Sequence, residues 1–85
     1  MDNSQEDDYQ ILVKNFVSDP KNRPYLIDIT KMSASYVSRR VLKQDSAESK
    51  SELERELTKI KGLEKVDVDK FALNLVQYFF EKRKR

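Results

Sequence analysis

The chain has 85 residues, of which 38% are hydrophobic and 38% are charged, so it can form one small domain with a thin core. It contains no histidine, no cysteine and a single glycine, which argues against an enzyme, a thiolate metal site and a glycine-rich nucleotide-binding loop. No apolar stretch reaches the length of a bilayer span. We therefore expect an intracellular, non-catalytic protein without a membrane segment, cofactor, metal or small-molecule substrate.

The formal net charge of +2 conceals a strong segregation of charge along the chain. Residues 1–8 contain four acidic residues and no basic one, whereas residues 14–43 contain seven basic residues and two acidic ones. The chain ends in four consecutive basic residues, 82–85. This pattern predicts a disordered acidic N-terminus (1–8), one helical domain (9–82) and a basic tail (83–85), with the basic character concentrated where an anionic partner would bind.

The first predicted helix covers residues 9–17. Its apolar residues, at positions 9, 12, 13, 16 and 17, recur at the spacing of one helix face. Pro20 and Pro24 then break the chain, and Pro24 suits the first turn of the next helix.

Two structures compete for residues 24–43. In the first, the segment is one long helix whose core-facing residues are Leu26, Ile29, Ser33, Tyr36, Val37 and Val41. In the second, a tight turn near residues 31–34 separates two helices. The serines at positions 33, 35 and 38 favour the break, because serine caps helices better than it extends them.

A polar connector is expected at residues 44–50. Ser51 and Glu54 then match a capping box that opens a helix through Leu53, Leu57 and Ile60. Gly62 suits the left-handed residue after a helix, and residues 63–68 alternate as an extended segment does. Asp67 or Asp69 is expected to cap the last helix.

The last predicted helix, residues 71–80, is the centre around which we expect the other helices to pack. Eight of its ten residues are apolar or aromatic. Its polar neighbours and interruptions, Lys70, Asn74, Gln77 and Glu81, form one narrow stripe, which is typical of a helix buried on several sides. The predicted fold class is therefore all-α, a small domain of four or five helices around a buried C-terminal helix.

Residues 26–43 resemble the turn and recognition helix of helix-turn-helix DNA-binding domains, including those of the ParB type. Met32, Ser33 and Val37 match the turn and anchor positions, whereas Lys31 and Arg40 depart from the usual glycine and apolar residue. The resemblance implies a DNA-binding protein of transcription or DNA maintenance, acting as a monomer or a dimer, with a basic recognition helix. Its predicted DNA-binding residues are Ser33, Ser35, Tyr36, Ser38, Arg39, Arg40 and Lys43.

The alternative is a helical protein-interaction subunit of a larger complex, without nucleic-acid contact. Its predicted anchors are the C-terminal aromatic residues Tyr78, Phe79 and Phe80, because aromatic residues dominate interface hot spots. Residues 66–71 also resemble the final loop and helix of small histone-fold subunits, but the polar stretch 46–61 interrupts the place of the long central helix of that fold.

Overall fold

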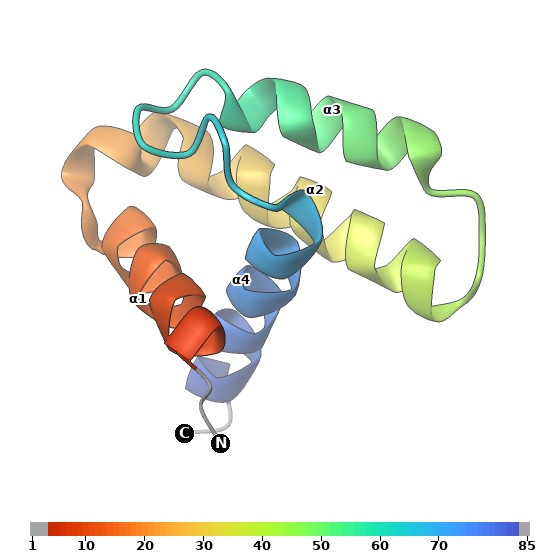
Figure 1. Ribbon diagram of the computed structural model, residues 1–85, viewed down its shortest axis with the longest axis horizontal. Helices are drawn as coiled ribbons and strands as arrows, with labels where there is room; N and C mark the ends of the chain where they lie inside the picture. Colours follow the sequence, from red (N-terminus) through yellow and green to blue (C-terminus); the bar gives the residue numbers. More distant parts are fainter. Residues whose placement is uncertain (1–3, 84–85) are drawn as a thin grey trace.

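The computed structural model describes residues 4–83, and the side chains of residues 8–81. These residues form α1 (Ser4–Ser18), the 3-10 helix η1 (Pro20–Asn22), α2 (Arg23–Val41), α3 (Ala47–Leu57) and α4 (Val68–Arg83), and no strand. Helix α2 runs across the molecule, with α3 along one side and with α1 and α4 on the other (Figure 1). The predicted all-α fold is confirmed.

Helix α4 lies between α1 and α2, and it supplies the centre of the core as predicted. Phe71, Ala72 and Leu75 are completely buried. The ring of Phe71 meets Phe16 of α1 edge to face, with 5.7 Å between the ring centroids. Because three of its faces touch other elements, α4 needs the high apolar content that distinguished it in the sequence.

Helix α1 has the predicted core face, with Val13 and Phe16 buried. It begins at Ser4, however, so residues 4–8 are helical where we expected disorder. Residues 1–3 of the predicted acidic N-terminus and residues 84–85 of the predicted basic tail lie outside the described residues. The expected break follows α1: Asp19 accepts a hydrogen bond from the backbone N–H of Lys21 at 2.9 Å and caps η1.

Residues 23–41 form one helix, so the single-helix alternative is correct and no turn interrupts the helix at residues 31–34. The serines are accommodated in two ways, because Ser33 is buried between helices whereas Ser35 and Ser38 point to solvent. Val41 is wrong as a core residue, since 73% of it is exposed. It lies in the last turn of α2, on the side of the helix next to the buried stripe of Ile29, Ser33 and Tyr36.

The connection between α2 and α4 differs most from expectation. Helix α3 begins at Ala47 and not at Ser51, because Asp45 accepts the backbone N–H of Ala47 at 3.1 Å. Residues 58–67 form turns and not an extended segment, with Gly62 in the left-handed region at φ 95°. Asp67 caps α4 as predicted, by accepting the backbone N–H of Lys70 at 3.2 Å.

The burial of the Ser33 hydroxyl is expected to lower the stability of the fold. It is completely buried, and its hydroxyl has no hydrogen-bond partner among the described residues. Ser33→Ala removes a buried, unpaired polar group and improves helix propensity, so we expect the free energy of unfolding to rise by about 1 kcal/mol. Urea denaturation measures this change.

Ser35→Ala is the matched control, because Ser35 is exposed on the same helix and reports helix propensity alone. A Ser33→Ala protein that is less stable than the Ser35→Ala protein would mean that the Ser33 hydroxyl has a partner in solution.

Candidate functional site

The seven predicted DNA-binding residues divide between two opposite faces of α2. Because successive residues of an α-helix are rotated by about 100°, Ser33, Tyr36 and Arg40 extend the inward stripe that begins at Ile29. Ser33 is completely buried and Tyr36 is 2% exposed. Both residues are therefore removed from the candidate nucleic-acid surface, since the packing of α2 against the core covers them.

Tyr36, Arg40 and Asp69 join the last turns of α2 to the first turn of α4. The Tyr36 hydroxyl donates a hydrogen bond to Asp69 Oδ1, and Arg40 Nη1 donates one to the Tyr36 hydroxyl at 3.1 Å. The same Arg40 nitrogen lies 3.1 Å from Asp69 Oδ2. Arg40, predicted to contact phosphate, is thus engaged within the chain, although its side chain remains half-exposed.

This cluster shifts the titration of both charged members. The hydrogen bond from Tyr36 is the main cause that lowers the pKa of Asp69 below its ordinary value, and the hydrogen bond and charge of Arg40 lower it further against partial desolvation. The pKa of Arg40 is raised by its hydrogen bonds to Tyr36 and Asp69. Asp69 and Arg40 therefore stay ionised as a pair at neutral pH.

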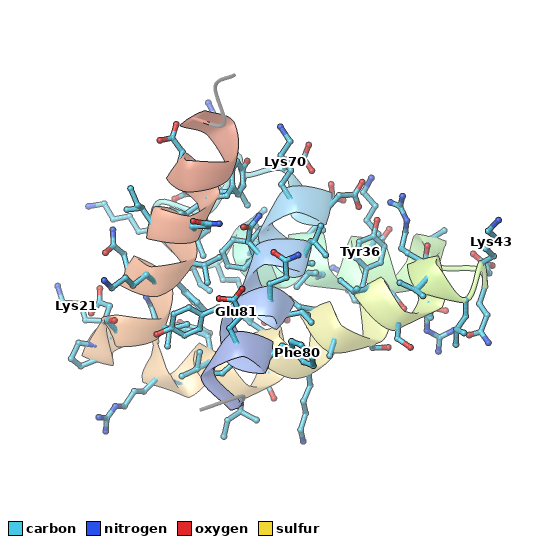
Figure 2. The ribbon with its side chains drawn as sticks, turned by 90° about the horizontal axis from the view of Figure 1, so that it is seen from below. Lys21, Tyr36, Lys43, Lys70, Phe80 and Glu81 are labelled. Atoms are coloured by element: carbon cyan, nitrogen blue, oxygen red, sulfur yellow. The ribbon has the colours of Figure 1, made fainter. Side chains whose placement is uncertain are left out.

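Lys43 is placed by the way in which α2 ends. The backbone N–H of Gln44 donates to Arg39 O at 2.8 Å and that of Lys43 donates to Arg40 O at 3.1 Å, the two bonds of a Schellman motif. Lys43 takes the left-handed position at φ 60°, where glycine is usual. Its side chain is exposed beside the end of the helix (Figure 2).

The remaining predicted residues Ser35, Ser38 and Arg39 lie on the exposed side of α2, which we call the basic face. Five exposed cations along η1, α2 and its C-terminal turn make no ion pair with any residue that the structure describes: Lys21, Arg23, Lys31, Arg39 and Lys43. Acidic residues adjoin this face, because Asp28 is exposed on α2 and Glu52 of α3 shares a shallow hollow with Lys31 and Ser35.

A second surface is apolar and begins where Asp69 meets α2. On α4, Leu73, Val76 and Phe80 follow Asp69 at helical spacing, with Leu73 46% and Phe80 61% exposed. On α2, Val37 and Val41 follow at the same spacing beside the junction. Phe80 and Tyr36 lie on the same side of α4 (Figure 2). We call these five residues, Val37, Val41, Leu73, Val76 and Phe80, the α2–α4 surface.

The predicted aromatic anchors divide as well. Tyr78 and Phe79 are partly buried and meet edge to face, with 5.4 Å between their ring centroids. Only Phe80 is largely exposed. The exposure of Leu73 and Val41 was not predicted. The sequence shows that both residues are apolar and lie in helices, but not whether another helix covers them.

Comparisons of the chain with protein-family models, curated proteins and solved structures find no match. No helix in the described part of the chain is long and apolar enough to cross a membrane. Among these residues there is also no group of three or more acidic, histidine or cysteine side chains that could hold a metal ion.

The Tyr36–Asp69 hydrogen bond predicts a pH-dependent loss of stability. Tyr36→Phe keeps the ring but removes the donor, so we expect the free energy of unfolding at neutral pH to fall by about 1 kcal/mol. The pKa of Asp69 is lower in the folded than in the unfolded chain, so its contribution is present above the ordinary pKa of 3.8 and is lost as pH falls through the folded value. The difference between the two proteins should therefore shrink below about pH 4.

Denaturation curves at several pH values measure this difference. Tyr25→Phe is the control, because the Tyr25 hydroxyl has no hydrogen bond to a described residue and Tyr25 is partly buried like many core-edge residues. An effect of Tyr36→Phe that stays constant down to about pH 3 would contradict the role of the Asp69 carboxylate.

Proposed function

We propose that this protein is a non-catalytic helical interaction module that binds a partner protein through the α2–α4 surface. The observation that carries the proposal is the exposure of Val41 at the end of α2 and of Leu73 and Phe80 along the side of α4 that begins at Asp69. Single exposed apolar residues are common on monomers, but a contiguous apolar set usually marks an interaction site.

The rest of the chain is consistent with this role. Twelve hydrophobic side chains are buried among the described residues, a small core to which binding of a partner would add stability. The chain has no histidine or cysteine with which to catalyse a reaction. An aromatic residue among aliphatic ones, as Phe80 is here, is the usual composition of an interface hot spot.

A capture experiment tests the proposal. The wild-type protein and the variant Val41→Asp with Leu73→Asp are immobilised, and the proteins that each retains from a lysate of the source cells are quantified. We expect a discrete partner whose retention falls at least tenfold in the variant. A carboxylate buried in an apolar interface should weaken binding by about as much as the loss of a hot-spot residue, roughly 2 kcal/mol.

Ile11→Asp is the matched control, since Ile11 is an equally exposed apolar residue on α1, outside the α2–α4 surface. Circular dichroism establishes that all three proteins are folded. A partner set that is identical for the wild type and both variants would contradict the proposal.

The second candidate function is binding of DNA through the basic face. It is favoured by the five cations without an ion pair, because such side chains are available to release counterions from phosphates. The small side chains of Ser35 and Ser38 would let a phosphate backbone approach α2. With Ser33 and Tyr36 buried, this binding would depend on charge and carry little base readout.

Fluorescence anisotropy of a labelled DNA duplex at two salt concentrations tests this function. We expect Lys31→Ala with Arg39→Ala to weaken binding and to lower the slope of log K against log salt by about 2. Lys14→Ala with Arg55→Ala removes the same charge from α1 and α3 and should change the slope far less. Equal effects of the two double variants, or no binding by the wild type at low salt, would reject the basic face.

A further inference from the structure

The apolar residues Val37 and Val41 of α2 belong to a longer, mostly apolar row that continues toward the start of the helix at heptad spacing. Ile27, Thr30, Ala34, Val37 and Val41 alternate in steps of three and four residues, the pattern with which one helix packs along another. Ile27 is 67% and Val41 73% exposed, and Ala34 is exposed between them. We call these five residues the α2 seam, which covers about 21 Å of helix.

The α2 seam is distinct from the stripe that holds α2 in the fold. The inward stripe contains Ile29, Ser33 and Tyr36, all buried, whereas the seam lies about a quarter-turn away and is covered only at Thr30 and Val37. The exposed seam residues are Ile27, Ala34 and Val41. The small side chain of Ala34, between the two larger ones, leaves room for another helix to approach closely. The chain has thus one apolar helix face for its own core and one beside it that its own helices cover only in part.

The charges along the α2 seam have one sign. Lys31 flanks it and Arg23 continues its line at the N-terminal end; both are exposed and make no ion pair with a described residue. Arg40 also flanks it, next to the carboxylate of Asp69, which is already engaged by Tyr36 and Arg40. Asp28 lies on the other side of α2, about 100° from the seam. A binding helix would therefore meet the unpaired cations Arg23 and Lys31, whereas the exposed acids Asp28 and Glu52 lie beyond Lys31, on the side of the basic face.

We infer that the partner segment bound by the α2–α4 surface is an acidic amphipathic α-helix that packs along the α2 seam. This inference rests on the proposed interaction function and adds the conformation and charge of the partner. Leucine or isoleucine at heptad positions of the partner would contact Ile27, Ala34 and Val41. Glutamate or aspartate beside them would pair with Arg23 and Lys31, giving orientation and a faster, salt-dependent association.

Two synthetic helical peptides of about three heptads test the inference. Both carry leucine at the core positions, and one has glutamate and the other lysine at the flanking positions. Binding of each labelled peptide to the wild-type protein is measured by fluorescence anisotropy, at peptide concentrations below self-association. We expect the glutamate peptide to bind at least fivefold more tightly at low salt, with a smaller ratio at high salt.

Charge reversal identifies the seam as the site. Lys31→Glu should weaken the glutamate peptide and strengthen the lysine peptide, whereas Lys14→Glu, on α1, should leave the ratio close to the wild-type value. Val41→Asp with Leu73→Asp should weaken both peptides. The Ile11→Asp protein serves again as the control for an exposed apolar residue elsewhere.

Three outcomes would overturn the inference, and each separates it from the proposed function. The two peptides could bind with equal affinity and both lose binding in Val41→Asp with Leu73→Asp. The surface would then bind helices without selecting them by charge. Failure of both peptides, with a captured partner still dependent on Val41 and Leu73, would mean a partner that is not a helix. A wild-type dimer in sedimentation that dissociates in the same variant would assign the surface to a second copy of the chain.

Discussion

The burial of Ile29, Ser33 and Tyr36, with the Tyr36 hydroxyl hydrogen-bonded to Asp69, sets how α2 is rotated about its own axis, and the locations of the basic face and of the α2–α4 surface depend on that rotation. The two residues are 33 positions apart in the sequence, and together with Arg40 they join the end of α2 to the start of α4. With Tyr36 turned inward, Ser33 and Ile29 are buried by the helical period, and Lys31, Ser35, Ser38 and Arg39 must face outward. A rotation of α2 by half a turn would exchange the core and the basic face.

The predictions that were confirmed depend on local chemistry. The apolar spacing of α1, the prolines at positions 20 and 24, the apolar content of α4 and the Asp67 cap are each decided within a few residues, so the sequence was sufficient. The start of α3 was wrong for a related reason. The Asp45 side chain accepts the backbone N–H of Ala47, so α3 begins at Ala47, about one turn before the predicted capping box at Ser51.

The candidate site was harder to predict because it depends on contacts between distant residues. The sequence showed that residues 33–43 contain the polar and basic side chains of a possible recognition helix, but not which of these side chains face α4. Ser33 and Tyr36 are residue types that occur both in cores and on DNA-binding surfaces, and only the packing of α2 against its neighbours shows that both are buried here. Likewise, Leu73 and Phe80 have the composition of core residues, and their exposure follows from the absence of a described helix over that side of α4.

The two candidate functions use neighbouring faces of one helix, and this constrains how they relate. Lys31 belongs to the basic face and lies at its border with the α2 seam, so a helix bound on the seam would neutralise a cation that phosphate binding needs. Because each phosphate contact contributes its own salt-dependent term, loss of Lys31 to a partner would weaken binding of a nucleic acid without blocking it. By linkage, nucleic acid would weaken binding of the partner by the same factor. A protein that used both faces would therefore bind its two partners with negative coupling, transmitted by charge through α2 and without any change of fold.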